Sequence, residues 1–449
     1  MRDRFEQLLR PWLPYLPDSE IYLVGGTVRD ILMGREPNDF DFVVIKQDAA
    51  SVAREFAHRI RGVVVELDPT RNEYRVVKQP YTFDFVGADD LYEDLKRRDF
   101  TVNAIAYSVR ERKLIDIVGG VRDIESKLLR AVREVNLRDD PLRILRAFRL
   151  QAEYGFRFEE GLPKLLRKYR GLLNNVARER IGEEMRRILA ASAGKVIRRM
   201  AEYEVLDVVL PEIKPMRRLP HFKFPVGSLL EHSLWTLEEV ERYQPTREWE
   251  AKYLDEKLWL VKLAGLLHDV AKPQTLREEG NEVHFYGHDI IGARIIRKKT
   301  KEELRLSNDE TKVVSTIVRL HMRPHLLMGE PVLTRHAMWR LIRDSETNIV
   351  GVMVVAYADG IASGGRQMDK LKRVRDAVYD LYEELQKPKL PRLVTGYDLI
   401  DMGLKPGPIF KEILGEVEEL QVEGVITTRE QALEYVKKKV DELKSSGRV

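Results

Sequence analysis

The chain has 449 residues, of which 43% are hydrophobic and 33% are charged, and its formal net charge at pH 7 is only +4. This length predicts at least two domains with real cores, and the small net charge excludes nucleic-acid binding through a uniform basic field. The absence of cysteine excludes disulfides and cysteine-ligated zinc. Without a long apolar run or a leader-like start, we expect a cytoplasmic protein.

The segment 22–44, YLVGGTVRDILMGREPNDFDFVV, predicts a strand, a Gly-Gly turn, a short helix and a second strand. Gly25 and Gly26 lack a Cβ, so backbone N–H groups can approach a phosphate there, and Arg29 lies one helical turn further on. Asp39 and Asp41 leave the same face of the second strand, where neighbouring carboxylates favour a divalent metal. The combination predicts nucleotidyl transfer, although alternating acids also occur on solvated strands.

Two further charged positions follow in the part of the chain where strands and helices alternate. Asp84 lies within the predicted strand YTFDFVG, where it is either a third carboxylate at the metal site or an acid on a solvated face. Arg98 ends the basic run KRR between a strand and an apolar segment. It is placed to contact a triphosphate, whereas a run of surface charge is the simpler alternative.

The segment 139–150, DDPLRILRAFRL, predicts a helix with acids at its start. Arg143, Arg146 and Arg149 recur every three residues and therefore line one side of this helix. An ordinary amphipathic helix would show the same spacing.

Five segments in one order resemble the class II tRNA nucleotidyltransferases and bacterial poly(A) polymerases. They are GGTVRD, DFDF, KRRDFTVNAIA, GGVRDIESK and DDPLRILRAFRL, and the resemblance covers about the first 210 residues. The resemblance implies a nucleotidyltransferase head that extends an RNA 3′ end by two-metal catalysis without a nucleic-acid template.

The resemblance also implies a role for each of these residues. Asp39 and Asp41, with Asp84 as a candidate third carboxylate, would bind catalytic Mg²⁺. Gly25, Gly26, Arg29 and Arg98 would hold the nucleotide. Asp140 and Arg143 would pair with the edge of the incoming base, and Arg146 and Arg149 would assist in the same pocket. The implied substrates are CTP, ATP and tRNA lacking its 3′ CCA.

Two departures from the family pattern bear on specificity. Asp139 stands where the family usually has Glu at the head of the base-reading helix. In addition, YTFDFVGADD runs almost directly into LYEDLKRRDF, which leaves little room for the family's polar loop. Loss of that loop is typical of enzymes that add the two cytidines and leave adenosine to a separate A-adding enzyme. We therefore expect CC addition, with full CCA addition and poly(A) polymerisation as alternatives.

A second group of residues with metal-binding side chains follows residue 210, where four of the nine histidines combine with two aspartates. The six candidate metal ligands are His232, His268, Asp269, His288, His321 and Asp359. The segment GLLHDVAKP resembles the HD phosphohydrolase superfamily. The resemblance implies a divalent metal site that hydrolyses phosphoesters, for example a 2′,3′-cyclic phosphate on an RNA end, or else a helical RNA-binding body with an idle site.

The predicted fold class is an α+β head, a small mixed sheet with helices, followed by an all-α body. The predicted domains are the head at 1–130, a helical neck with the base-reading helix at 131–210, the HD domain at 211–385 and a tRNA-contacting tail at 386–449. Pro-rich basic segments, KPMRRLPHFKFPVGS and KPKLPRL, are the predicted linkers. A chain acting only as an HD phosphohydrolase, or only as an RNA-binding protein, remains an alternative.

Overall fold

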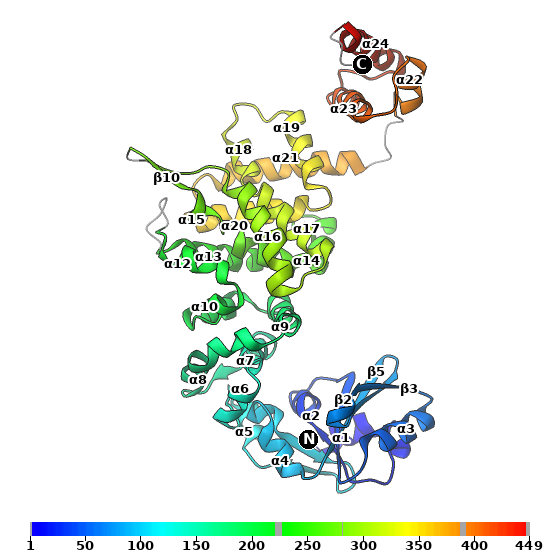
Figure 1. Cartoon of the computed structure of the whole chain (residues 1–449), viewed down its shortest axis with the longest axis vertical. Coiled ribbons are helices and arrows are strands. Elements are labelled where there is room, and N and C mark those ends of the chain that lie inside the picture. Colours follow the sequence, from blue (N-terminus) through cyan, green and yellow to red (C-terminus); the bar gives the residue numbers. More distant parts are fainter. Residues whose placement is uncertain (1, 221–226, 281, 387–391, 446–449) are drawn as a thin grey trace. The chain divides into compact units, whose positions relative to one another are not determined.

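The computed structural model describes residues 2–220, 227–280, 282–386 and 392–445 (Figure 1). It divides into two compact units, one built on residues 1–212 with 302–305 and the other on residues 213–301 with 306–449. Both predicted linkers fall partly outside the described residues. The predicted fold class is confirmed: a mixed sheet with helices precedes a helical body.

The N-terminal unit begins with the sheet and its helices. Their bounds, in chain order, are α1 (Arg2–Leu9), β1 (Ile21–Val24), α2 (Gly25–Leu32), β2 (Asp39–Ile45), α3 (Ala49–Ile60), β3 (Val63–Asp68), β4 (Glu73–Lys78), β5 (Tyr81–Ala88), α4 (Leu91–Arg97), β6 (Ile105–Ser108) and β7 (Lys113–Asp116). The seven strands form one sheet in the order β3-β4-β5-β2-β1-β6-β7. The pair β2 and β5 is parallel and lies at the centre, and the other neighbours are antiparallel.

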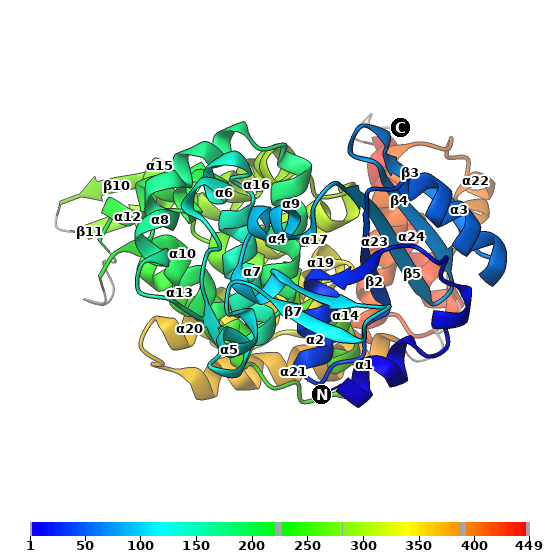
Figure 2. The same cartoon turned by 90° about the horizontal axis from the view of Figure 1, so that it is seen from below.

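The DFDF motif at the start of β2 separates the two faces of the sheet. Phe40 and Phe42 are buried and stack on Phe83 and Phe85 of β5, with ring centroids 5.3 and 5.2 Å apart. Phe56 of α3 packs against both β5 rings, so α3 covers this face, as Figure 2 shows. Because strand side chains alternate, the aspartates between these rings point to the opposite face.

Helices follow the sheet to the end of the unit. They are α5 (Gly120–Glu125), α6 (Glu134–Asp139), α7 (Arg143–Tyr154), α8 (Leu162–Tyr169), α9 (Arg178–Ala190), α10 (Gly194–Glu202) and α11 (Leu206–Val209), with a short parallel pair β8 (Leu128–Leu129) and β9 (Arg157–Phe158). The predicted base-reading helix is α7, which ends at Gly155, a glycine with φ +72° that terminates the helix in the left-handed region.

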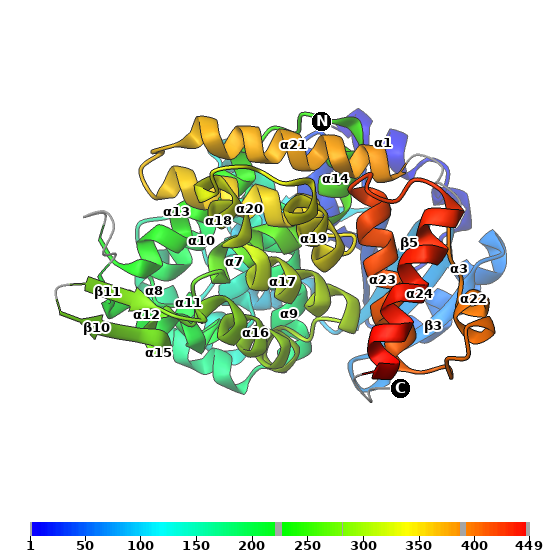
Figure 3. The same ribbon diagram turned by 90° about the horizontal axis from the view of Figure 1, so that it is seen from above.

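The second unit contains a helical bundle. Its elements are α12 (Lys214–Arg218), α13 (Leu229–Arg242), α14 (Glu248–Leu267), α15 (Lys272–Thr275), β10 (Leu276–Glu279), β11 (Glu282–Phe285), α16 (His288–Leu304), α17 (Asn308–Leu320), α18 (Arg323–Gly329), α19 (Arg335–Ser345), α20 (Ile349–Ala362) and α21 (Met368–Gln386). Among the described residues, the antiparallel pair β10 and β11 and the two-residue strand β9 depart from the predicted all-α body. Figure 3 shows α21 running along α18, α19 and α20.

The tail consists of α22 (Gly396–Asp401), α23 (Pro408–Val422) and α24 (Arg429–Ser445). These helices bury a core of their own, which includes Leu399, Ile413 and Val436. The last helix, α24, begins directly after Thr428. No described helix is long and apolar enough to span a membrane.

Candidate functional site

The three candidate carboxylates of the head lie together on the face of the sheet opposite α3. Asp41 of β2 is the direct neighbour of Asp84 on β5, and Asp39 is the neighbour of Thr82, whose hydroxyl donates to it. Thr27 at the start of α2 accepts a hydrogen bond from the Asp41 backbone N–H at 3.0 Å. Asp39 and Asp41 therefore project from one face of the sheet, and Asp84 projects from the same face.

Electrostatics at these carboxylates favour a cation. Burial raises the pKa of Asp41 to about 6; Arg98 acts in the opposite direction, while Asp84 and Asp39 raise it further. Asp84 already forms an ion pair, since Arg75 of β4 donates to both of its oxygens at 2.7 Å. Adjacent carboxylates on one face of a sheet suit a divalent metal, and Asp39 and Asp41 are the candidates to hold it.

The Gly-Gly turn brings the backbone close to these carboxylates. Gly25 has φ +69°, and a Cβ built on it would lie 2.8 Å from Nη1 of Arg98 and 3.3 Å from Oδ2 of Asp41. Asp94 of α4 holds the Arg98 guanidinium at 2.8 Å. Gly25, Arg98 and Asp41 therefore meet at one point, which is where a phosphate chain next to a metal would lie.

Arg29 contacts three side chains of the same unit. Its guanidinium is buried and donates to Asn103 and to the hydroxyl of Tyr154, each at 2.6 Å, and it also contacts Asp30 at 2.9 Å. These partners occupy most of its donors. Arg29 therefore ties α2 to α7, and its predicted contact with the triphosphate stays a prediction.

A polar cavity of about 560 Å³ lies at the start of the base-reading helix. Its lining residues are Arg71, Arg97, Asn136, Asp139, Asp140, Arg143 and Arg180. Arg180 of α9 reaches the two Asp140 oxygens at 3.4 and 3.3 Å, and Arg143 donates to the Asn136 carbonyl at 3.2 Å. Carboxylate and guanidinium side by side offer an acceptor and donors to a base edge.

The other two arginines of α7 lie outside the lining of this cavity. Arg146 lies 3.0 Å from Asp99, a buried carboxylate. Burial alone would raise the pKa of Asp99, but Arg146 and Asn103 outweigh it and lower that pKa. Arg149 is buried between Glu184 of α9 and Glu153, at 2.7 and 2.9 Å. Both hold α7 in place, so of the three arginines predicted to share one pocket, only Arg143 lines it.

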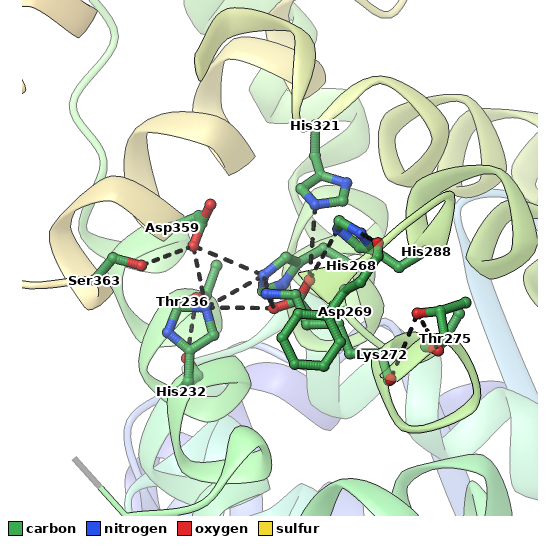
Figure 4. A network of polar contacts seen from close by, with 12 residues as sticks. His232, Thr236, His268, Asp269, Lys272, Thr275, His288, His321, Asp359 and Ser363 are labelled. Atoms are coloured by element: carbon green, nitrogen blue, oxygen red, sulfur yellow. Dashed lines mark hydrogen bonds and ion pairs between the residues drawn. The ribbon is translucent and has the colours of Figure 1, made fainter. Parts of the chain in front are cut away.

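The six predicted HD ligands converge from five parts of the bundle, as Figure 4 shows. His232 comes from α13, His268 and Asp269 from the end of α14, His288 from α16, His321 from the end of α17 and Asp359 from α20. Five of them form two groups that share Asp269, and Oδ1 of the sixth, Asp359, lies 3.0 Å from Nε2 of His232. Nε2 of His232 and Nε2 of His268 lie 3.7 and 3.1 Å from Oδ2 of Asp269, whereas Nε2 of His288 and Nε2 of His321 lie 3.5 and 3.8 Å from Oδ1.

Backbone carbonyls fix the orientation of three of the imidazoles. Nδ1 of His268, His288 and His321 lies 2.8, 2.8 and 2.7 Å from the carbonyl oxygens of Gly265, Phe285 and Val318. An Nδ1–H donated outward leaves the Nε2 lone pair pointing inward, which is the arrangement of metal-ligating histidines. The buried Nε2 atoms of His288 and His321 have no hydrogen-bond partner among the described residues.

The protonation states agree with this arrangement. Burial lowers the pKa of His321 to about 3 and also lowers the pKa of His288, so both rings are neutral at physiological pH. Burial opposes the charge of Asp269, yet His268 and Lys272 outweigh it and hold the pKa of Asp269 well below its usual value. His268 differs from these two rings, because Asp269 outweighs burial and raises the pKa of His268. The neutral rings of His288 and His321 beside an ionised carboxylate are a donor set that fits a divalent metal.

Family models cover both parts of the chain. Residues 21–85 and 65–130 match the poly A polymerase head domain, and residues 155–217 match the probable RNA and SrmB-binding site of polymerase A. Residues 229–364 match the HD domain, and residues 297–436 match a putative tRNA nucleotidyltransferase domain 2.

Whole-length relatives decide the family. The chain is 31% identical over 453 residues to the A-adding tRNA nucleotidyltransferase of Deinococcus radiodurans, with 97% of this chain and 99% of that protein covered. It is 32% identical over 447 residues to the CC-adding tRNA nucleotidyltransferase of Thermus thermophilus, with 94% of each covered. The chain belongs to the class II tRNA nucleotidyltransferases and carries an HD domain. It is therefore a nucleotidyltransferase, from a family that uses divalent metals.

Solved structures share the fold of this tRNA nucleotidyltransferase. A CCA-adding enzyme in complex with CTP matches it with a TM-score of 0.71 at 22% identity, covering 97% of this chain and 96% of that one. The Thermotoga maritima CCA-adding enzyme complexed with tRNA matches with a TM-score of 0.66 at 21% identity, covering 98% of this chain and 94% of that one.

Several residues at these two sites were not predicted from the sequence. Arg180 and Asn136 line the cavity but lie in helices of ordinary amphipathic pattern, so no local signal marks them. In the HD cluster, Lys272 lies 2.6 Å from Oδ2 of Asp269, and His325 of α18 lies 3.0 Å from Oδ2 of Asp359. The spacing HDVAK, which puts Lys272 one helical turn after the His-Asp pair, is a signal that could have found the lysine.

Replacing Gly25 with alanine is expected to lower kcat/KM for nucleotide addition about 100-fold, because the new Cβ displaces Arg98 from Asp41. Gly119 is the matched control. It also has a positive φ, +79°, but a Cβ there meets nothing within 4 Å. Gly119→Ala suffers only the backbone strain, about 1 kcal/mol. Equal losses in the two variants would contradict a role for close approach at Gly25.

Divalent-metal affinity of the head is expected to fall as the pH drops through about 6, since Asp41 has a raised pKa and its protonated form cannot act as a ligand. Mn²⁺ titrations of the HD-site variant Asp269→Asn, followed by electron paramagnetic resonance between pH 5 and 8, isolate the head. An affinity that stays constant over this range would refute the expectation.

Proposed function

We propose that this enzyme adds CMP from CTP to the 3′ end of tRNA lacking its CCA, using Mg²⁺ held by Asp39 and Asp41, and leaves the terminal adenosine to a separate A-adding enzyme. One observation carries the CC-adding subtype. β5 ends at Ala88 and α4 begins at Leu91, so only two residues lie where the family has its polar loop. With this segment absent, the chain has no element at that place to reshape the base cavity from cytosine to adenine.

The head residues divide the chemistry among them. The metal, when bound, lowers the pKa of the RNA 3′-hydroxyl and stabilises the charge that develops on the phosphates. Asp39 and Asp41 hold it on the open face of the sheet. Gly25 and Arg98 position the triphosphate beside it, so that the α-phosphate faces the hydroxyl. Arg75 fixes Asp84 directly beside Asp41, and we assign Asp84 to the catalytic carboxylates that face the metal, with Asp39 and Asp41 as the metal ligands.

Base choice is assigned to the cavity at α7. The Asp140 carboxylate accepts from an exocyclic amine, which cytosine carries and uracil lacks, and Arg143 donates to the ring acceptors. Arg180 holds Asp140 by its two oxygens, so it sets the direction of the acceptor. A base with the wrong edge does not match the acceptor of Asp140 and the donors of Arg143, which is the physical source of rejection.

Sequencing the 3′ ends of extended tRNA tests the subtype. Transcripts that end at the discriminator base, after one C and after two C are incubated with CTP, ATP or both. We expect two cytidines on the first, one on the second and none on the third, with no adenosine anywhere. Adenosine after CC together with cytidines would indicate full CCA addition, adenosine alone an A-adding enzyme, and long adenosine tails a poly(A) polymerase.

Arg143→Ala is expected to reduce discrimination between CTP and UTP at least tenfold while the affinity for the triphosphate changes little, because Arg143 faces the base cavity and not the carboxylates. The ratio of kcat/KM for the four nucleotides measures this. Arg110→Ala, at an exposed position of the same unit, serves as the control. Unchanged discrimination in Arg143→Ala would refute the assignment.

We also propose a second activity, metal-dependent hydrolysis of phosphoesters on RNA ends at the HD cluster. The supporting observation is the preset orientation of three imidazoles toward Asp269. Lys272, 2.6 Å from Asp269, supplies a cation for a phosphate. RNA bearing a 2′,3′-cyclic phosphate, tested with Mg²⁺, Mn²⁺, Ni²⁺ and Co²⁺, measures it. An HD cluster that binds metal without turnover would limit this part of the chain to RNA binding.

The domain assignments are part of the same proposal. The head at 1–130 performs catalysis and the neck at 131–210 reads the base and contacts the acceptor arm. The HD domain occupies 211–385, and the tail at 386–449 contacts the outer corner of the tRNA. The compact core of the tail supports its treatment as a separate module.

A further inference from the structure

The edge strand β3 presents an exposed apolar row. Val63 is 67% exposed, and Val65 and Leu67 are each 41% exposed. These residues alternate along the strand, so Val63 and Val65 project from one face. An exposed apolar row on the edge strand of a sheet is typical of a binding surface.

Strand register shows which face this is. Val65 is paired with Arg75, Arg75 with Asp84, and Asp84 with Asp41. Directly paired residues share a face, so one row crosses four strands from the exposed valine to the metal-binding carboxylate. A second row runs in the same way from Val63 through Val77 and Thr82 to Asp39.

The opposite face is closed. Tyr74 and Val76 alternate with the residues of these rows, and both are buried on the side that α3 covers. Val63 and Val65 are thus the outer end of the open face that carries the carboxylates. With strands about 4.8 Å apart, they lie about 14 Å from Asp39 and Asp41.

We propose that the apolar row of β3 binds the nucleosides immediately upstream of the RNA 3′ end. The inference rests on the proposed function, because it identifies the acceptor strand of that same site. The RNA 3′-hydroxyl must reach the metal at Asp39 and Asp41, so the nucleosides before it must leave along the open face. Aliphatic side chains contact the flat faces of bases without reading their edges, which suits an acceptor whose end changes after each addition.

The charge at the end of the row supports an RNA occupant. Arg71, at the turn between β3 and β4, is 78% exposed in its side chain and also lines the base cavity. A backbone phosphate of a strand lying over Val63 and Val65 can be met there by a guanidinium. Arg75 lies within the row itself, between the valines and the carboxylates.

Steady-state kinetics of the double variant Val63→Ser/Val65→Ser, in the full-length chain, test the proposal. The matched control is Val332→Ser, a valine that is 69% exposed in the other unit. We expect the KM for tRNA ending at the discriminator base to rise about tenfold in the β3 variant and to stay unchanged in the control. The KM for CTP is expected to stay the same in both.

Abasic substrates identify the contact. tRNA acceptor-stem minihelices that lack one base, at each of the last three positions in turn, are compared in both proteins. At the position that lies over β3, removing the base is expected to raise the KM of the wild-type chain and to add nothing in the variant. Fully additive effects at all three positions would overturn the proposal.

The remaining outcomes are distinct. If the wild-type chain adds nothing to intact tRNA, the proposed function fails and this inference fails with it. If it adds cytidines and the KM for RNA is unchanged in the β3 variant, only the RNA contact is refuted. If sedimentation shows a wild-type dimer that the variant converts to a monomer, the row is an interface between two copies of the chain, which also overturns the proposal.

Discussion

Replacing Asp41 with asparagine is expected to lower kcat for CMP addition roughly 10³-fold or more, equivalent to about 4 kcal/mol of transition-state stabilisation. The physical reason is local. Asp84 has both oxygens engaged by Arg75, and Asp39 is the more exposed of the remaining pair. Asp41 is therefore the carboxylate that no neighbour can replace, next to both Gly25 and Arg98.

Rapid-quench measurement of a single CMP addition at saturating CTP checks this expectation, because it isolates the chemical step. Asp89→Asn, an exposed carboxylate just beyond β5, serves as the control and is expected to retain full activity. Hydrolysis at the HD cluster should be the same in Asp41→Asn as in the wild type. An Asp41→Asn enzyme that extends tRNA at the normal rate would remove the basis of the head assignment.

Replacing Asp269 with asparagine is expected to abolish HD phosphoesterase activity, a loss of roughly 10³-fold or more, while CMP addition stays normal. Asp269 is the only one of the six ligands with an oxygen facing each group of histidines. An amide cannot supply two anionic oxygens, so both groups lose their shared ligand together.

Metal content gives a readout that does not depend on turnover. After removal of metals and addition of Mn²⁺, mass spectrometry of the intact chain should show fewer bound ions in Asp269→Asn than in the wild type. Asp309→Asn, at an exposed position in the first turn of α17, is the control. Thermal unfolding separates loss of metal from loss of fold, because Asp269 is buried and also pairs with Lys272. Full metal binding with full hydrolysis in Asp269→Asn would refute the assignment.

The head could be predicted from the sequence because its signals are local. Alternation in DFDF places two phenylalanines in the core and two aspartates on the other face, and the structure has this arrangement. The position of Asp84 beside Asp41 could not be predicted in this way. It depends on a parallel pairing between strands 43 residues apart in the chain, and local sequence does not specify register over that separation.

The arginines of α7 show where periodicity is insufficient. A three-residue spacing correctly predicts one side of a helix, but 100° per residue spreads three such positions across that side. Arg143 therefore faces the cavity, Arg146 meets Asp99, and Arg149 meets Glu184 on another helix. The HD ligands were found more completely because histidines are rare in this chain, so each one carries more information than an arginine.

Asn136 connects the base cavity to the segment that carries Arg98. Its side-chain amide donates to the backbone carbonyls of Lys96 and Arg98 at 2.9 and 2.8 Å. Its backbone carbonyl accepts a hydrogen bond from Arg143. One residue thus links the arginine beside the carboxylates to the arginine that faces the base. Under the proposed function, we expect a mismatched base that shifts Arg143 to shift Arg98 and the phosphate beside it as well. Fidelity should consequently be expressed in the maximal rate of misincorporation more than in how weakly the wrong nucleotide is retained.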